Sequence, residues 1–327
     1  MAKRSKRKYG MRKMEPAVMT TTFVSPTVGA GSIGTSFICL SQVASLINRR
    51  FYRQGINWAV GGMKILTAPN FGGQLKVSKV PTTWVAFQAY KAAFDAWNKQ
   101  QMDAIEESGA ESAVAAFRDF KIFADVEHVN AGYAANLLPH DGQVPPQPYA
   151  VGEWEPSQIV IPHSGGTPGQ TVERTLHMVG INVNGTVSRG IIDGYADSRA
   201  FPQSPDPVSP DLSSTANWMA RMFDDAQTYS DVLDNATDRN DNLPYPQADY
   251  PGGALQAPTL EIHDLVAISA TTIGGQSRVK GGQFPCGLIR LDWAPSATNP
   301  TEVGYTLQID LVPGTHRGYM CEKMLEA

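Results

Sequence analysis

The sequence predicts a mainly β fold, an antiparallel jelly-roll β-sandwich with inserted helices and a disordered basic N-terminal arm. The chain of 327 residues contains 30 glycines and 23 prolines, which favours many turns over a helical bundle. Roughly eight or more short apolar runs lie between turn signals, as is typical of sandwiches and jelly rolls. Seven of the first thirteen residues are basic, and this stretch has almost nothing apolar to fold around.

The N-terminal arm is expected to stay disordered and to bind nucleic acid. Its like charges repel one another, which opposes a compact structure. Lys and Arg on a flexible segment neutralise phosphates and release counterions, so the binding would be salt-sensitive and independent of base sequence. A nuclear localisation signal is an alternative or overlapping role. The candidate nucleic-acid-binding residues of the arm are Lys3, Arg4, Lys6, Arg7, Lys8, Arg12 and Lys13.

Residues 15–34 are rich in Thr, Gly and Pro and predict an extended linker, so residues 1–34 form the arm and linker and residues 35–327 the jelly-roll domain. Three further basic residues, Arg49, Arg50 and Arg53, would extend the basic surface; the alternative is an ordinary solvated face.

Short apolar runs bounded by turn signals predict the strands. Gly61-Gly62 and Gly72-Gly73 are two such signals. Ser41–Arg53 is ambiguous, because its apolar spacing also fits a helix. Strands are expected at Phe37–Leu40, Ile56–Val60, Lys64–Leu66, Leu75–Val80, Phe120–Val129, Gln158–Ile161, Val172–Val179, Gly190–Tyr195, Leu260–Ser269, Leu288–Trp293 and Tyr305–Val312.

A helical insertion is predicted at residues 82–118. Thr82 or Thr83 can cap its start. A second helical segment follows at Met102–Arg118, with Gly109 as a break. The large side chains that recur at helical spacing are Trp84, Phe87, Tyr90, Phe94 and Trp97.

The region 201–258 is predicted to be a long acidic, Pro-rich loop. A weakly periodic stretch of this length inside a compact domain is usually functional or part of an interface. Its carboxylates could bind calcium, but no EF-hand pattern is present, and a solvated loop is the simpler interpretation. The candidate subunit-interface residues are Trp218, Phe223, Tyr229, Tyr245 and Tyr250.

Charge is divided unevenly along the chain, since no Asp or Glu occurs between Glu15 and Asp95. A basic N-terminal part points to a nucleic-acid or membrane partner. No apolar run is long enough to cross a bilayer, so no membrane insertion is expected. The three cysteines have no metal-ligand spacing and are expected to be reduced and buried.

No catalytic, metal or cofactor pattern is recognised, so no enzyme activity, no metal and no cofactor are expected. An enzyme on a β scaffold, such as a glycan hydrolase, remains an alternative, and it would need paired carboxylates in a cleft. Asp193 or Asp197 could contribute one of them.

Several motifs together resemble one family. They are Leu176–Gly180, Gly190–Arg199, Trp218-Met219, Met222–Asp225, Tyr250–Gly253 and Val312–Tyr319. With the basic N-terminus, they make the chain similar to capsid proteins of small circular Rep-encoding single-stranded DNA (CRESS-DNA) viruses, and the likeness covers most of residues 35–321.

The resemblance implies a jelly-roll capsid protein that assembles with itself into an icosahedral shell of sixty copies or a multiple. The basic arm would face inward on a single-stranded DNA genome, and assembly would occur in the host nucleus after import. The helical insertion exceeds a minimal jelly roll. The alternative function is a non-viral nucleic-acid-binding β-domain with a basic tail.

Overall fold

The computed structural model describes residues 15–69, 71–109, 119–162, 171–180, 188–200, 259–269, 271, 275–299 and 301–325. The seven basic residues of the arm lie outside the described residues, and so do residues 110–118 of the helical insertion. The acidic loop at 201–258 lies outside them too, with its candidate interface residues Trp218, Phe223, Tyr229, Tyr245 and Tyr250.

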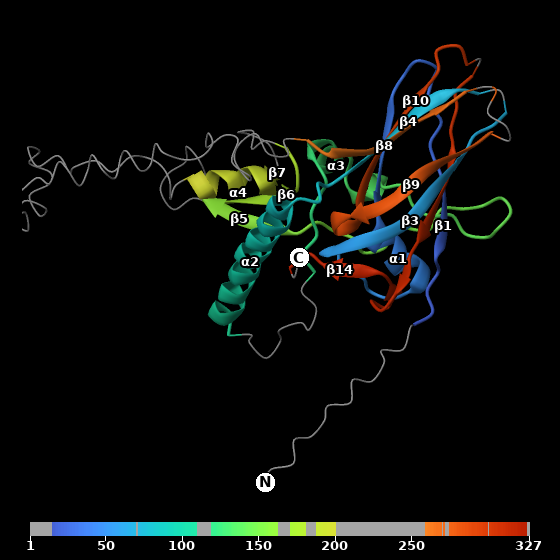
Figure 1. The fold of residues 1–327 in the computed structure, drawn as a ribbon. Coiled ribbons are helices and arrows are strands. Elements are labelled where there is room, and N and C mark those ends of the chain that lie inside the picture. The colour runs from blue at the N-terminus through green and yellow to red at the C-terminus, as the bar shows by residue number, and fades with distance from the viewer. Residues whose placement is uncertain are drawn as a thin grey trace, which may run out of the picture.

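Two antiparallel sheets form the main body of the protein (Figure 1). In the first sheet the strand order is β1-β11-β3-β9, and in the second it is β2-β10-β4-β8. The mainly β class and the antiparallel pairing predicted from the sequence are therefore confirmed. The strands are β1 Thr20–Val24, β2 Gly34–Cys39, β3 Ile56–Leu66, β4 Gly73–Lys79, β8 Glu261–Ile268, β9 Gln276–Phe284, β10 Leu288–Pro295 and β11 Thr306–Leu311.

Alternating residues of both sheets point inward and form one core. On β11, for example, Leu307, Ile309 and Leu311 are buried, whereas Gln308 and Asp310 between them are not. This period of two is what a strand with one buried face requires. The core also contains Phe23, Ile38, Trp58, Ile65, Leu75, Leu291 and Trp293; it is called the sandwich core below.

A helix and three short strands complete the sandwich near its two chain ends. Helix α1, Leu40–Asn48, follows β2 directly, which resolves the ambiguous segment in favour of a helix. Near the C-terminus, β14 pairs with the start of β3, with Cys321 opposite Trp58. The remaining short elements are β12 Pro313–Gly314, β13 Gly318–Tyr319, β14 Cys321–Lys323 and the 3-10 turn Pro285–Gly287.

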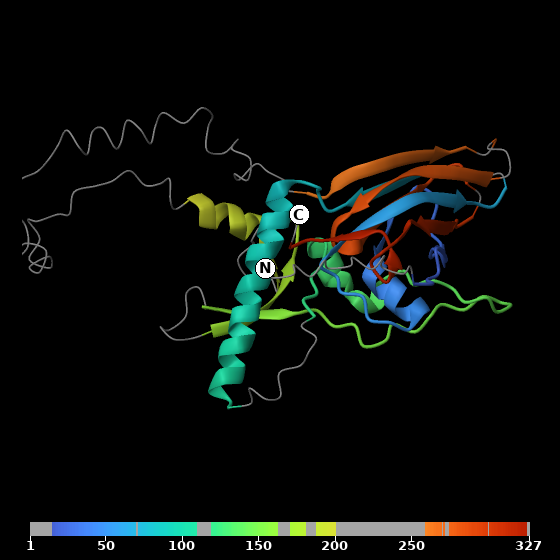
Figure 2. The same ribbon diagram turned by 60° about the horizontal axis from the view of Figure 1, so that its bottom comes forward.

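All other elements come from the connection between β4 and β8 and lie beside one end of the sandwich (Figures 1 and 2). They enclose a second core, rich in aromatic residues, that includes Tyr90, Trp97, Phe120, Phe123 and Tyr133. These elements are α2 Trp84–Glu107, α3 Val126–Ala131, the 3-10 turn Tyr133–Ala135, β5 Gln158–Pro162, β6 Thr171–His177, β7 Ser188–Gly190 and α4 Ile191–Ala200.

The helical insertion is confirmed where it is described. Helix α2 begins after Thr83, whose side chain accepts a hydrogen bond from the Ala86 amide at 3.4 Å, and it ends just before Gly109, which has φ 66°. The segment from Met102 to Glu107 is the end of this same helix and does not begin a separate one.

Two predicted strands are wrong. Within Phe120–Val129 the chain forms helix α3, because the Asp125 carboxylate caps it by accepting a hydrogen bond from the His128 amide at 2.8 Å. Within Gly190–Tyr195, strand β7 ends at Gly190 and helix α4 begins, with Ile191 and Ile192 buried in the second core.

Three parts of the sheets differ from the prediction. Thr20–Val24 lies in the expected linker but forms β1, paired with β11 from Thr20–Asp310 to Val24–Thr306. Strand β9 was not predicted. Gly61-Gly62 is not a turn: it lies within β3, where a Cβ on the facing Gly281 would come within 2.4 Å of the Gly61 carbonyl oxygen. The glycines therefore permit a close approach of two backbones.

Cys39, Cys286 and Cys321 are free; the first two are buried as expected, and Cys321 is half-buried. Trp154 and Trp293 are both buried. None of the described helices combines the length and the apolar character needed to cross a membrane.

Candidate nucleic-acid interface

The three basic residues predicted to extend the arm's surface follow helix α1 but do not act as one patch. Arg49 ends the helix in a left-handed conformation (φ 51°) and is exposed. The Arg50 guanidinium pairs with the Glu15 carboxylate at 3.0 Å. Arg53 lines a pocket. The structure thus assigns a different environment to each of the three.

The root of the arm is held against the C-terminal part of the chain. Besides the Arg50–Glu15 ion pair, the backbone of residues 15–17 crosses Gly318 closely, since a Cβ there would lie 2.9 Å from the Glu15 carbonyl oxygen. Gly318 has φ 103°, which also favours glycine. The basic arm therefore joins the described fold next to Arg317.

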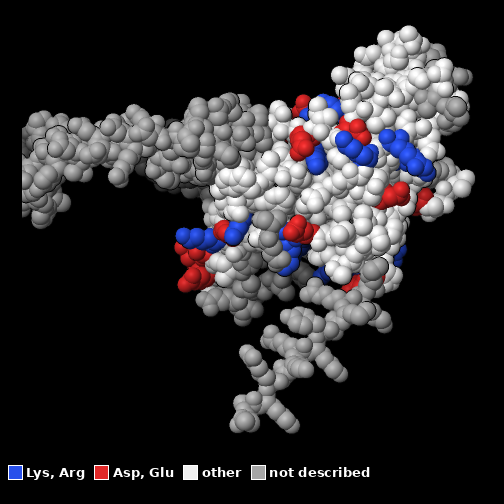
Figure 3. All heavy atoms as spheres, in the orientation of Figure 1, with Lys and Arg blue, Asp and Glu red and all other residues white. Residues whose placement is uncertain are grey.

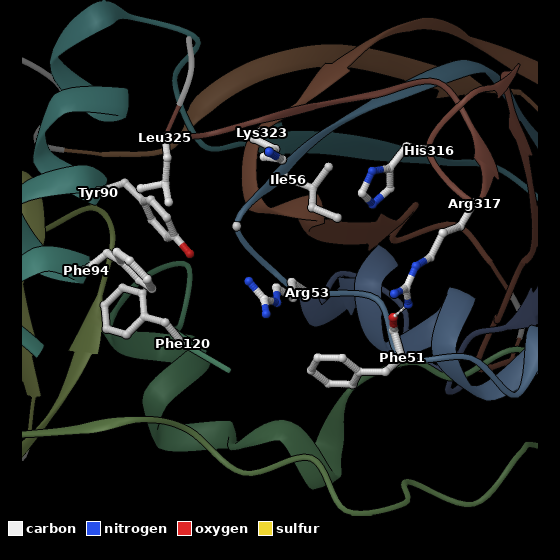
Figure 4. Close-up of a pocket in the computed structure, with 11 residues that line it drawn as sticks. Phe51, Arg53, Ile56, Tyr90, Phe94, Phe120, His316, Arg317, Lys323 and Leu325 are labelled. Carbon is white, nitrogen blue, oxygen red and sulfur yellow. Dashed lines mark hydrogen bonds between the residues drawn. The ribbon is translucent and has the colours of Figure 1, made fainter. Parts of the chain in front are cut away.

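A pocket of about 250 Å³ lies where the C-terminal segment, the segment after α1 and helix α2 meet (Figure 4). One wall is aromatic and belongs mainly to α2 and the chain before α3, while the opposite wall is basic. Its lining residues are Phe51, Arg53, Gly55, Ile56, Tyr90, Phe94, Phe120, His316, Arg317, Lys323 and Leu325.

The basic wall carries Arg53, Arg317 and Lys323, and the lining includes no acidic residue. Neither Arg53 nor Arg317 has an ion pair with a carboxylate within the described parts of the chain. Arg317 donates a hydrogen bond to the Phe51 carbonyl, which fixes its direction. The guanidinium groups are therefore available to an anionic group.

The pKa of His316 is affected by the positive charge of this wall. Burial lowers the pKa of its imidazole first, and the neighbouring Arg317 and Lys323 charges lower it further. The imidazole is thus neutral at physiological pH. A phosphate placed between these groups would oppose the last two effects and raise the pKa of His316.

The aromatic wall consists of Tyr90, Phe94 and Phe120. The Phe120 ring lies 5.5 Å from that of Tyr90 and 5.8 Å from that of Phe94, both edge-to-face. Phe94 is only half-buried, so part of its ring is open to the pocket, and the half-buried Phe51 lies across from it (Figure 4).

The hydroxyl of Tyr90 points into the pocket (Figure 4). Tyr90 is 2% exposed, and its hydroxyl has no hydrogen-bond partner among the described residues. Gly55 makes room for it, since a Cβ there would lie 2.5 Å from the hydroxyl oxygen. Burial raises the pKa of Tyr90 well above its ordinary value, so the phenol stays neutral and can donate a hydrogen bond.

Asp119, whose charge acts on the Tyr90 phenol, is already paired. Its carboxylate contacts Lys121 at 2.5 Å, and burial raises its pKa against the opposing effect of Lys121. On the face of the molecule drawn in Figure 3, basic and acidic side chains are interspersed, so this face carries no field of one sign.

Of the predicted binding residues, the structure places only Arg53 in the pocket and Arg50 at the arm's root. Arg317, Lys323 and the aromatic wall were not predicted as binding residues, although Arg317 lies in one of the motifs that carry the resemblance. Asp193 and Asp197 both lie on helix α4. Within the described residues, no group of three or more His, Cys, Asp or Glu is placed to hold a metal ion.

Comparisons with known proteins identify no relative. No family model matches the chain, and no match is found among the curated proteins or the solved structures.

Proposed function

We propose that the protein is a viral capsid protein that self-assembles into an icosahedral shell and packages a single-stranded DNA genome through its basic N-terminal arm. Its main partner is then itself, in sixty copies or a multiple. It acts in the virion after assembly in the host nucleus, reached through the host import machinery.

The observation that carries this proposal is the strand order. Numbered only among themselves, the eight strands of the two sheets run 1-8-3-6 in one sheet and 2-7-4-5 in the other. Two Greek keys wound together give this order, and we therefore interpret the sandwich as a jelly roll. Viral capsid proteins, lectins and cupins use this architecture.

The basic arm separates the capsid interpretation from the other uses of a jelly roll. A shell that encloses nucleic acid needs cations on its inner surface, and seven basic residues precede β1, the first strand of the sandwich. The arm begins beside the pocket described above, so both would face the genome.

The test is electron microscopy of the full-length protein expressed alone, with the 260/280 nm absorbance ratio of any particle fraction. We expect uniform closed shells that contain nucleic acid. Deleting residues 1–13 should lower the nucleic-acid content. In the control, Gln replaces the seven basic residues at unchanged length, and an equal loss would assign the effect to charge.

Small soluble oligomers under all conditions would overturn the proposal. If those oligomers still bound added DNA, the non-viral nucleic-acid-binding β-domain would be the better interpretation.

A further inference from the structure

We infer that the pocket between α2 and the C-terminal segment binds one base of a single-stranded nucleic acid, with its phosphate on Arg53 and Arg317. This inference rests on the proposed packaging function and deepens it. The arm would bind nucleic acid electrostatically and independently of its sequence, while the pocket would hold one nucleotide in a defined position.

The two walls match the two parts of a nucleotide. Proteins that hold single strands combine a basic groove for the backbone with aromatic rings on which bases stack. Here the partly open rings of Phe94 and Phe51 line the same pocket as the Arg53 and Arg317 guanidinium groups (Figure 4). Arg guanidinium groups can also bind phosphate with two parallel hydrogen bonds.

The Tyr90 hydroxyl provides an independent indication of a polar ligand. The side chain is otherwise buried, but its hydroxyl opens onto the pocket without a hydrogen-bond partner among the described residues, so it can hydrogen-bond to a water or to a ligand there. The hydroxyl is aimed into the pocket and held neutral by burial. It would hydrogen-bond to the edge of the stacked base.

The size of the pocket suits a small part of a ligand, such as one base. Its volume of about 250 Å³ is below the range of roughly 300–1,000 Å³ for sites that enclose drug-sized molecules. The remainder of the strand would lie outside it. Because the arm's root contacts Gly318, next to Arg317, a strand neutralised by the arm would already be near the pocket.

The experiment compares two fluorescent probes on the full-length protein, an oligothymidylate and an abasic oligonucleotide of the same length and charge. Both have the same phosphates, but only one has bases to stack. At a salt concentration that weakens the arm, we expect the wild type to bind the oligothymidylate about tenfold more tightly, in line with the loss of one stacked base.

The variants assign this preference to residues. Phe94→Ala and the bulkier Phe94→Leu, which keeps an apolar side chain without a ring, should both reduce the preference to about twofold. Tyr90→Phe, which removes only the hydroxyl, should reduce it partly. Arg53→Gln should weaken both probes alike and lower the slope of log K against log salt by about 0.7. The matched control, Arg278→Gln on the exposed face of β9 and outside the pocket, should leave the affinity for both probes and the salt slope as in the wild type.

Equal binding of the two probes by the wild type would overturn the inference, as would a preference that Phe94→Leu leaves intact. A preference present in subunits but absent from assembled shells would also overturn it, in favour of a neighbouring copy that fills the pocket. Failure of the proposed function would look different from failure of this inference. The protein would then bind the oligothymidylate more tightly than the abasic probe but would not form closed shells.

Discussion

The sandwich core and the second core are built differently. The sandwich core is formed by alternating residues of two sheets, and its largest buried side chains include Trp58 and Trp293. The second core is enclosed by the helices and short strands of one long connection. Both fully buried histidines of the described chain, His128 and His177, lie beside it.

Specific hydrogen bonds organise the second core. The Gln54 amide donates to the Ile122 carbonyl at 2.9 Å and accepts from the Ile122 amide at 2.5 Å. The His128 Nδ1 accepts from the Ala124 amide at 3.1 Å, so its Nε2 carries the proton and donates to Asn136 at 2.9 Å. The sandwich core should therefore depend mainly on packing, and the second core on polar groups whose partners are irreplaceable.

Removing a large side chain from the sandwich core should have the largest effect. Trp58 is fully buried, contacts Tyr319 at a ring distance of 5.3 Å and donates to the Ser41 hydroxyl at 3.1 Å. Trp58→Ala should lower the free energy of unfolding by about 3–5 kcal/mol. Urea unfolding followed by circular dichroism would measure it, and a loss under about 1 kcal/mol would contradict a close-packed sandwich.

Mild acid should weaken the second core before the sandwich core. Burial lowers the pKa of His128 to about 4, against about 6.5 in the unfolded chain. Between these values the unfolded state binds more protons, so stability falls as the pH falls. His128 alone then costs about 2 kcal/mol at pH 5 relative to pH 7.5, and the buried His177, whose pKa burial also lowers to about 4, acts in the same direction.

Hydrogen exchange at pH 7.5 and pH 5 would locate this loss, which we expect in α3 and not in β11. His128→Gln should remove the dependence attributed to His128. His263→Gln, in the sandwich, is the control. If acid increased exchange equally in both cores, the second core would not be the more acid-sensitive of the two.

The ion-pair network of Arg290 joins the two regions and should have an intermediate effect. From β10, Arg290 pairs with Asp125 at 2.8 Å, Glu127 at 2.7 Å and Asp292 at 2.9 Å. Arg290→Met should cost about 1–2 kcal/mol, because it removes the ion-pair partner of the half-buried Asp125 and one of the two partners of the buried Asp292. It should also increase exchange in α3. Lys76→Met, which removes the more exposed partner of Asp292, should cost less.

The smallest effect is expected at the start of α2. Thr83→Ala removes the cap and should cost about 0.5–1 kcal/mol, seen as a small fall in Tm. Thr82→Ala is the matched control, because the neighbouring residue is exposed and makes no cap hydrogen bond. Equal effects of the two variants would remove the cap as the explanation.

The difference between the two regions also explains which elements could be predicted from the sequence. The period of two in β10 and β11 and the stripe of α2 are local patterns, so those elements were predicted. Helix α3 begins at the Asp125 cap, a local signal that the prediction of a strand over Phe120–Val129 passed over. Its His128 stacks on Phe37 of the distant strand β2, a contact that no local pattern shows. Strand β1 was missed because its apolar alternation is short and its partner, β11, lies at the other end of the chain.

The candidate site was predictable only in part for a related reason. Charge density alone indicated the arm and Arg53. Arg317 and Lys323 face Tyr90 and Phe94 only because the C-terminal segment returns to the start of β3. Pairings of this kind depend on the complete tertiary structure.

The long connection between β4 and β8 also sets the order of events during synthesis. Strands β1 to β4 emerge first, but their partners β8 to β11 follow about 180 residues later, which at roughly 5–20 residues per second is a delay of about 9–36 s. Until then the apolar faces of the first four strands have no sheet to cover them. The sandwich can therefore close only after β8 to β11 have been synthesised, and until then chaperones would be needed to protect the nascent chain.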